Sequence, residues 1–384
     1  MKILLLSRYS TQGASSRIRS FQYLPYLESM GCSVEVEPLF DNGYIESLYK
    51  LRQREQAESL IEKKYHSQTD VPVSVLSKDK TVMLMAYARR LRLVCNSGKY
   101  DLVWIEKELF PWLPPWVELI ISRLGIPYVV DYDDAVFHKY DLNKSGIVRL
   151  LLGNKIKTAM RGAKAVIVGN AYLAEYAHQA GASRVEIIPS VVDLSKYSPR
   201  IVRTYEKNDS NFIIGWIGTP STIWYLNAIE DALREVARKF PIELVIVGGG
   251  DFQIQGVNVS SIPWTESSEV QEIQKFDIGV MPLPQSPYEM GKCGYKLIQY
   301  MACGVPAVAS PVGVNSEIIS NGVSGFLASS MKEWVDAISL ILTNRELYSA
   351  MREEGIKKVE REYNLALCEK KLFSLLISLG GVKQ

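Results

Sequence analysis

The sequence is poor in cysteine and histidine, which argues against a disulfide-stabilised or metal-binding protein. Its five cysteines form an odd set without a CxxC pair, and its three histidines are scattered along the chain. Unpaired thiols are typical of a cytoplasmic protein. Because no spacing of metal ligands appears, we predict no metal site and no other cofactor.

Long hydrophobic runs and a strong charge excess are missing as well. No apolar run approaches the roughly 18 residues of a membrane span, and the N-terminal stretch 1–10 lacks the long apolar core and cleavage site of a signal peptide. The formal net charge is only +2, whereas a nucleic-acid-binding domain is usually strongly basic. We therefore expect a cytoplasmic protein without a nucleic-acid partner.

Two glycine-rich nucleotide fingerprints are absent. No GxGxxG follows the apolar run Ile3–Leu6, where a dinucleotide-binding fold would place it, and no GxxxxGK(S/T) occurs. The triple glycine Gly248–Gly250 follows a predicted strand, but Asp251 and Phe252 interrupt the fingerprint, so we interpret it as a turn. NAD and ATP chemistry are accordingly disfavoured.

What the sequence does contain is an alternation of strands and helices that occurs twice. At 384 residues the chain exceeds the size at which single cores stop growing. Strands separated by helices indicate parallel pairing and doubly wound α/β sheets. We predict strands at Ile3–Leu6, Val34–Val36, Leu102–Ile105, Tyr128–Asp131, Ala165–Val168, Val185–Ile188, Phe212–Trp216, Ile242–Val247, Ile278–Met281 and Ala307–Ser310.

This alternation predicts two Rossmann-like domains that face each other across a cleft. We place the first domain at residues 1–197, a polar linker at 198–211 and the second domain at 212–365. A long amphipathic helical tail is expected from Asn344 to Leu379, and the C-terminal helix in 366–384 is expected to pack back on the first domain. Ligands of such sheets bind beyond the carboxyl ends of the strands, which here means between the domains.

The segment Met281–Gly313 is the most informative part of the chain. It combines a buried strand, a glycine-bracketed turn that carries Lys292, and a helix from about Gly294 to Cys303. Free backbone N–H groups and the helix dipole make a helix N-terminus a site for an anion, and Lys292 adds a positive charge. The pattern predicts a phosphate-bearing ligand. An ordinary βαβ crossover with turn-forming glycines explains it equally well, and the local pattern leaves both interpretations open.

Several motifs resemble those of the retaining glycosyltransferases of family 4, over nearly the whole chain. They include the loop Gly13–Arg17, the element Ile187–Asp193 with Tyr197–Pro199, and above all the run Gln299–Pro306, QYMACGVP. The resemblance implies the GT-B architecture, with a nucleotide-sugar in the C-terminal domain and the acceptor in the N-terminal domain. It also implies independence of metal, because backbone N–H groups, a helix N-terminus and basic side chains stabilise the leaving diphosphate.

The resemblance further implies where the donor is bound. Gly13 and Ser16 match the N-terminal glycine loop that meets the diphosphate. Asn315 and Glu317 lie in the loop where donor-sugar and phosphate contacts fall, and Trp264 lies in the segment that usually contacts the base. A partly buried loop tryptophan without a ligand is an equally good interpretation of Trp264.

Three positions depart from the family pattern. The family commonly has two glutamates eight positions apart, and these positions hold Gly291 and Gln299 here, with Glu289 as a nearby substitute for the first. The Arg and Lys that usually follow the first strand of the donor domain are absent, and Thr219 stands near their place. The departures leave a loss of activity open.

A relocated cation is the expected replacement for the missing basic pair. Lys292 and Lys296 stand four positions apart and Gln299 follows three positions later, so one face of the helix carries polar groups toward a ligand. We predict donor contacts for Lys296 and Gln299, and also for Gly291 and Thr219. The predicted catalytic residues are Lys292, Asp133 and Glu289.

The acceptor side is expected around the segment Val130–Asp134. It contains Asp131-x-Asp133, which is similar to the DxD motif that holds a divalent cation in another glycosyltransferase fold. Because the segment lies in the half opposite the donor helix, we favour binding of sugar hydroxyls by Asp133, Asp134 or His138. Aspartates that cap a helix are the remaining alternative.

Arg17 is predicted to contact a phosphate of the donor or of a lipid-linked acceptor, and its alternative is a solvated surface charge. Trp112 and Trp116 belong to a proline-rich aromatic loop, and a nearby helical stretch carries Arg89, Arg90 and Arg92. Aromatic residues with basic neighbours suit peripheral docking at a bilayer, here the inner face of the plasma membrane. Core packing explains the same residues without a membrane.

The sequence therefore predicts a retaining, metal-independent glycosyltransferase of the surface-polysaccharide type. It would move a hexose-type unit from a nucleoside-diphosphate sugar, with UDP favoured, to a glycan or lipid-linked glycan. Front-face attack is expected, with the departing phosphate taking the acceptor proton. Two alternatives are a degenerate member that binds without turnover and a nucleotide-sugar epimerase of the same fold, which would need an acid/base set.

Overall fold

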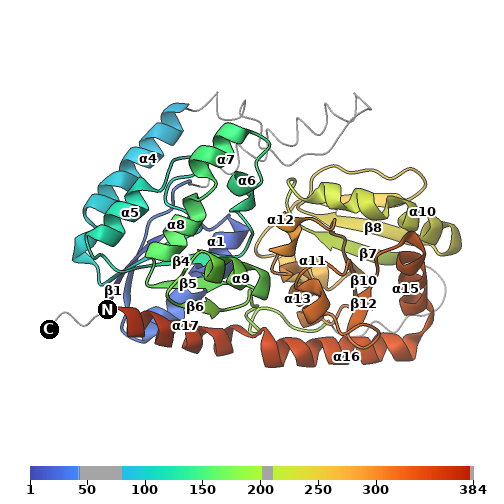
Figure 1. Ribbon diagram of the computed structural model, residues 1–384. Coiled ribbons are helices and arrows are strands. Elements are labelled where there is room, and N and C mark those ends of the chain that lie inside the picture. The colour runs from blue at the N-terminus through green and yellow to red at the C-terminus, as the bar shows by residue number, and fades with distance from the viewer. Residues whose placement is uncertain (42, 44–79, 201–210, 381–384) are drawn as a thin grey trace.

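The computed structural model describes residues 1–41, 43, 80–200 and 211–380, and it contains two α/β domains side by side (Figure 1). Each domain is built on a six-stranded sheet in which every neighbouring pair of strands is parallel. The predicted architecture of two doubly wound parallel-sheet domains is confirmed. Among the described helices, none is long and apolar enough to cross a bilayer.

The strands are short apolar runs, as expected for sheets that are covered on both faces. The first sheet has the order β2-β1-β3-β4-β5-β6, with β1 Lys2–Leu6, β2 Ser33–Val36, β3 Leu102–Glu106, β4 Tyr128–Tyr132, β5 Ala165–Val168 and β6 Val185–Ile187. The second has the order β12-β11-β10-β7-β8-β9, with β7 Phe212–Ile217, β8 Ile242–Val247, β9 Asn258–Ile262, β10 Ile278–Met281, β11 Ala307–Ala309 and β12 Gly325–Leu327.

Helices cover both faces of each sheet. In the N-terminal domain they are α1 Ala14–Arg19, η1 Phe21–Tyr23, α2 Leu24–Ser29, α4 Lys80–Cys95, η3 Ser97–Lys99, α5 Trp116–Arg123, α6 His138–Asp141, α7 Gly146–Leu152, α8 Lys155–Gly162 and α9 Ala171–Gln179. In the C-terminal domain they are η4 Ile223–Ile229, α10 Glu230–Lys239, α11 Glu269–Ile273, α12 Pro287–Met290, α13 Tyr295–Ala302, α14 Asn315–Ile318, α15 Met331–Thr343 and α16 Arg345–Glu362. Alternate residues of a strand face opposite sides, so Leu5 joins the core on the α2 side and Leu4 joins the core on the α4 and α5 side.

The C-terminal tail consists of two helices, α16 and α17 (Leu365–Leu379), which run along the same side of both domains (Figure 1). The chain bends at Asn364, whose side chain caps α17 and whose backbone pairs with Val192 of the N-terminal domain. The α17 helix packs on the N-terminal domain, where the rings of Phe373 and Tyr26 lie 6.1 Å apart. The single helical tail expected from Asn344 is therefore interrupted where the chain returns to the first domain.

The predicted linker 198–211 falls largely outside the described residues, because 201–210 are not described. Its first part is anchored on the C-terminal domain. Arg200 lies 3.2 Å from Asp277 and donates a hydrogen bond to the carbonyl of Phe276.

Candidate active site

The candidate site lies where the two domains meet. Ser15 in α1, Lys107 after β3 and the pair Asp133–Asp134 after β4 come from the N-terminal domain. β1, β3 and β4 are adjacent parallel strands, so the segments that follow them meet at one edge of the sheet. The segment 286–293 of the C-terminal domain approaches this edge and carries Lys292.

Two lysines, one from each domain, hold the carboxylates of Asp133 and Asp134. Lys107 Nζ lies 2.8 Å from Asp133 Oδ1 and 3.5 Å from Asp134 Oδ2. Lys292 Nζ lies 3.0 Å from Asp134 Oδ1, and Ser15 Oγ donates a hydrogen bond of 2.5 Å to Asp133 Oδ2. The structure therefore brings the predicted residues Lys292, Asp133 and Asp134 into one ion cluster that spans the domain interface.

Asp134 and Lys292 shift each other's pKa values toward their charged forms. Burial by itself would raise the pKa of Asp134. The positive charges of Lys292 and Lys107 more than offset this effect and lower the pKa to about 2. Burial lowers the pKa of Lys292, and the Asp134 carboxylate more than offsets this, so that the pKa lies well above its ordinary value. The ion pair with Asp134 therefore favours the charged form of Lys292, and its partner is a carboxylate of the other domain.

Lys107 was not predicted from the sequence. Its φ of 62° lies in the left-handed region, which a lysine rarely adopts. Burial lowers the pKa of Lys107, while Asp133 and Asp134 raise it above its ordinary value. The available signal was the charged run that begins at Glu106, directly at the carboxyl end of a buried strand.

The glycine loop at Gly13–Arg17 is held in place by hydrogen bonds of Ser16 and by close packing of Gly13. Ser16 Oγ donates to Glu106 Oε2 over 2.6 Å and accepts a hydrogen bond from the backbone N–H of Tyr9, and its side chain is fully buried. A Cβ at Gly13 would lie 2.4 Å from the Cβ of Tyr9. Both predicted donor contacts thus shape the loop, and the Ser16 hydroxyl already has partners.

A second set of contacts joins the domains around Glu269. The Arg17 guanidinium lies 4.5 Å from the centre of the Trp264 ring and 3.8 Å from Glu269 Oε2. Trp264 Nε1 donates to the same oxygen over 2.6 Å, and Tyr197 OH donates to Glu269 Oε1. Gln299 Nε2 donates to Tyr197 OH over 2.7 Å. The predicted residues Arg17, Trp264 and Gln299 are therefore connected through Glu269 and Tyr197. Glu269 was not predicted, and Tyr197 was noted only as part of a family motif.

Glu289 and Lys296 lie on the C-terminal side of the site. The carboxylate of Glu289 is buried and accepts hydrogen bonds from Tyr225 OH, at 2.7 Å, and from Ser286 Oγ. Lys296 Nζ lies 5.2 Å from the Trp216 ring. Burial, followed by repulsion from Lys292, lowers the pKa of Lys296 to about 8.

The remaining predicted donor residues have different surroundings. Thr219 follows β7, and its Oγ1 lies 2.7 Å from Ser221 Oγ. Asn315 is fully buried, and a Cβ built on Gly294, the N-cap of α13, would lie 3.5 Å from its Oδ1. That oxygen has no hydrogen-bond partner among the described residues. Glu317 is exposed in α14.

Gly291 is placed against the opposite domain. A Cβ at this position would lie 2.6 Å from Ala135 Cβ and 2.7 Å from Ala135 N. Asn170 Nδ2 donates to the carbonyl oxygens of Gly291 and Lys292, each over 3.0 Å, and Cys293 Sγ lies 3.0 Å from the Asp133 carbonyl oxygen. The close approach explains why a glutamate is not accommodated at position 291.

Gly291→Ala is expected to destabilise the protein by about 1–3 kcal/mol, because the added methyl group overpacks the domain contact. Gly98→Ala is the matched control, since a Cβ there meets nothing within 4 Å. Thermal unfolding of both variants measures the difference. Equal unfolding temperatures would show that the domains do not approach each other at Gly291.

His138 and Asp131 are occupied by other contacts. His138 Nδ1 lies 2.8 Å from Asp141 Oδ1, and His138 Nε2 lies 2.8 Å from Tyr172 OH. Asp131 is buried against Arg19, 2.8 Å away, so its carboxylate does not join that of Asp133 as a DxD pair would. Among the described residues, no group of three or more His, Cys, Asp or Glu side chains is placed to hold a metal ion.

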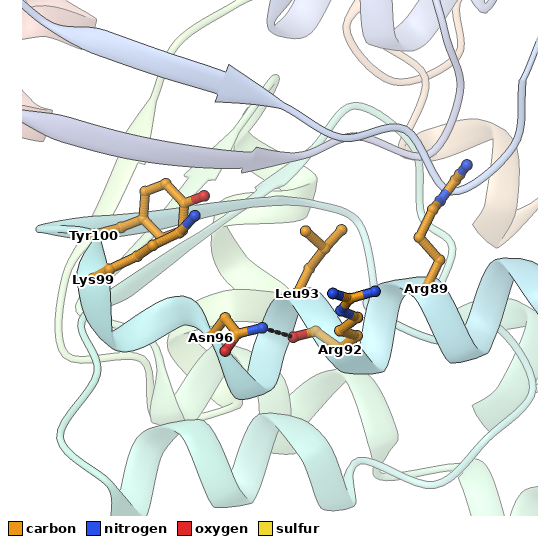
Figure 2. Close-up of a pocket in the computed structure, with 6 residues that line it drawn as sticks. All are labelled: Arg89, Arg92, Leu93, Asn96, Lys99 and Tyr100. Carbon is orange, nitrogen blue, oxygen red and sulfur yellow. Dashed lines mark hydrogen bonds between the residues drawn. The ribbon is translucent and has the colours of Figure 1, made fainter.

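The aromatic loop and its basic neighbours lie outside the ion cluster. Trp112 and Trp116 are exposed. Arg90 is buried and donates to backbone carbonyls of Ser7 and Glu37, so it cannot serve a surface. The basic pocket shown in Figure 2 is separate from the site; its lining residues are Arg89, Arg92, Leu93, Asn96, Lys99 and Tyr100.

The chain is similar to glycosyltransferases in both domains. Residues 62–190 match the model described as a glycosyl transferase 4-like domain, and residues 212–344 match the model of glycosyl transferases group 1. Both domains of the chain therefore match glycosyltransferase family models, and the two-domain fold is of the GT-B class.

Curated relatives and solved structures agree with this class. A D-inositol 3-phosphate glycosyltransferase from Segniliparus rotundus is 23% identical over 270 residues, which are 63% of this chain and 59% of the relative. A probable sucrose-phosphate synthase from Thermosipho melanesiensis is 32% identical over 83 residues, 22% of this chain and 19% of that protein. The chain therefore matches less than two thirds of the length of either relative.

Solved structures match over the full length. Sucrose-phosphate synthase from Thermosynechococcus elongatus has a TM-score of 0.69 at 15% identity and covers 99% of both chains. Anabaena HepE in complex with UDP has a TM-score of 0.68 at 18% identity and covers 99% of this chain and 100% of its own. At these identities the likeness shows the GT-B fold alone.

Proposed function

We propose that this protein is a retaining glycosyltransferase that takes a sugar from a nucleoside-diphosphate sugar without a metal ion. The observation that carries the proposal is Lys292, which stands at the mouth of α13 opposite Asp133 and Asp134. The N-cap Gly294 leaves the first backbone N–H groups of α13 without helical partners, and the helix dipole adds partial positive charge. A diphosphate would replace Asp134 as the partner of Lys292.

Donor chemistry follows from this charge arrangement. Negative charge grows on the leaving diphosphate in the transition state, and preorganised donors stabilise it there more than in the ground state. Lys292 and the N-terminus of α13 supply such donors, and Lys296 is near enough for Lys292 to lower its pKa. No covalent nucleophile is needed if the departing phosphate takes the acceptor proton during front-face attack.

A UDP-sugar is the proposed donor, and a glycan or lipid-linked glycan of a surface polysaccharide is the proposed acceptor. Solved structures of HepE in complex with UDP and with UDP-glucose support the choice of nucleotide. Asp133 and Asp134 lie on the acceptor-side domain at the interface, which supports a role near the acceptor hydroxyl. We place the reaction in the cytoplasm, where nucleotide-sugars would reach the site.

Incubation with a panel of UDP-, GDP- and dTDP-sugars in EDTA tests the proposal, with release of nucleoside diphosphate as the readout. Release from one donor identifies the substrate, and the anomeric configuration of the product, read by NMR, tests retention. A protein that binds a donor without releasing nucleotide, with or without metal and acceptors, would instead be a binding-only member. The amide of Gln299, which already donates to Tyr197 OH, is the observation that favours this second candidate.

Donor affinity is expected to fall about tenfold between pH 7 and pH 9, because Lys296 loses its proton around its pKa of about 8 and the bound diphosphate favours the charged form. At pH 9 the neutral Lys296 must take up a proton when the diphosphate binds, and this costs free energy. The affinity for the donor is therefore weaker at pH 9 than at pH 7. Titration calorimetry with UDP at both pH values measures this. Lys296→Met should abolish the slope; the same slope in the variant would contradict the assignment.

A further inference from the structure

Two helices of the N-terminal domain turn apolar side chains to the outside. On α7, Ile147 and Leu150 are 70% and 83% exposed, and Leu151 is exposed beside them. Positions i, i+3 and i+4 share one side of a helix, which is the side that a globular protein normally buries. The apolar stripe of α7 is therefore unpartnered within the described structure.

The α5 helix repeats this arrangement. Trp116 is 63% exposed, and Ile120 and Leu124 follow at intervals of four residues, also exposed. We call Trp116 and Ile120 of α5, Leu124 directly after it, and the three residues of α7 the apolar face. Patches of this kind mark sites of interaction with a partner or a membrane.

The aromatic loop that precedes α5 contacts α6, the helix that precedes α7. The Trp112 ring lies 5.3 Å from that of Tyr140 in α6, and the Trp112 backbone N–H donates to Tyr140 OH. The α6 helix packs against α7, and α5 packs against α8, which follows α7 in the chain. The exposed side chains of Trp112 and Leu142 extend the same region.

The stretch of chain that contains α7 carries charge of one sign. Residues 142–174, which contain α7 and α8, include no aspartate or glutamate but six basic residues: Lys144, Arg149, Lys155, Lys157, Arg161 and Lys164. Only Lys155 is buried in an ion pair, with Glu108. Exposed apolar side chains with basic neighbours are suited to a bilayer, whose headgroups are anionic and whose interior is apolar.

We propose that the apolar face docks on an anionic bilayer, with Ile147, Leu150 and Leu151 inserted among the lipids. This docking surface is larger than the tryptophan loop that the sequence indicated, because α7 supplies the most exposed side chains of the apolar face. A second copy of the chain fits less well, since a two-fold contact through α7 would bring Lys144 and Arg149 of both copies together.

Docking in this way would bring the bilayer close to the candidate site. Lys139 of α6 lies 5.8 Å from the ring of Tyr288, which belongs to the C-terminal domain next to Lys292. An acceptor anchored in lipid could thus be presented at the domain interface. Only this consequence rests on the proposed function; the docking itself does not.

Co-sedimentation with vesicles tests the proposal. Full-length protein is mixed with phosphatidylcholine vesicles, with or without about one third phosphatidylglycerol. We expect binding to the anionic vesicles that weakens at raised salt. Leu150→Asp should weaken it at least about tenfold, because a charge then replaces the most exposed apolar side chain.

Leu367→Asp in α17 is the matched control, since Leu367 is an exposed leucine on a different part of the N-terminal domain's surface. It should bind vesicles like the wild type. Circular dichroism and UDP binding are measured on the same preparations, so that a fold defect or a failed donor site is recognised separately. UDP binding without vesicle binding overturns the docking alone.

Three further results would overturn the proposal. The first is equal vesicle binding by the wild type and Leu150→Asp. The second is binding that does not depend on anionic lipid. The third is a wild-type dimer in light scattering that Leu150→Asp converts to a monomer, which would make a second copy the occupant.

Discussion

Lys292→Ala is expected to lower kcat/KM for sugar transfer about 10²- to 10³-fold, the range for removal of one preorganised donor to a developing anion. Lys292 stands just before α13, where the diphosphate is proposed to leave, and its ammonium group lies 3.0 Å from Asp134 Oδ1. Its loss also leaves Asp134 with Lys107 as its remaining ion-pair partner within 4 Å among the described residues. Steady-state kinetics with the donor found in the panel measures the effect.

Lys332→Ala is the control for this substitution. Lys332 lies in α15, which contributes no residue to the candidate site. Its side chain is exposed and paired with Asp336. The control should keep full activity. If Lys292→Ala transferred sugar as fast as the control, the proposed stabilisation of the diphosphate by Lys292 would be wrong.

Lys155→Met is expected to lower the free energy of unfolding by about 3–5 kcal/mol, the range for a buried ion pair that loses one partner. Lys155 Nζ lies 2.5 Å from Glu108 Oε2, and both side chains are almost fully buried under the site. Arg8 and Tyr140 remain as partners of Glu108, so the value should fall toward the lower end. Chemical denaturation at neutral pH measures the loss.

The pH dependence of stability tests whether the Lys155–Glu108 ion pair is the cause of this loss. Burial raises the pKa of Glu108, but Lys155 and Arg8 lower it below its ordinary value of 4.5, to about 2. The stabilisation from this group is therefore complete above about pH 4.5 and is lost as the pH falls toward 2. Lys155→Met should flatten this acid limb. The double variant Lys155→Met/Glu108→Gln should recover part of the stability, and a further loss would contradict the ion-pair explanation.

The sequence predicted the central strands of both sheets well because these are uninterrupted apolar runs. The predicted strands Ala165–Val168, Ile242–Val247 and Ile278–Met281 agree with the structure residue for residue. The strands β9 and β12 were missed. Both lie at an edge of the second sheet, where β9, NVSSI, is polar and β12 has only three residues, so neither carries the hydrophobic run that marks a buried strand.

The candidate site was predictable only where a residue type and a local motif coincide. Lys292 follows from its glycine-bracketed turn, and Asp133 and Asp134 follow from their position after a strand. Lys107 was not predictable, because its acidic partners stand 26 and 27 positions away. Glu269 has a near partner in Trp264, but its contacts with Arg17 and Tyr197 of the other domain are made only in the fold. Long-range pairings of this kind leave no mark in a single sequence.

At Gly291 the sequence showed a departure from the family motif but not its cause. The sequence showed that a glycine stands where the family commonly has a glutamate, which suggested a weakened site. The structure gives a packing reason instead, since Ala135 of the other domain occupies the space beside Gly291. A departure from a family motif therefore does not by itself indicate lost activity.

The central claim is that Lys292 and the N-terminus of α13 hold a nucleoside diphosphate without a metal ion. Calorimetric titration of UDP into the wild type and Lys292→Ala, both in EDTA, tests it most directly. The account predicts saturable binding to the wild type and at least about tenfold weaker binding to the variant, since a charged hydrogen-bonding partner is lost. Equal affinities, or binding by the wild type only after a divalent cation is added, would contradict it.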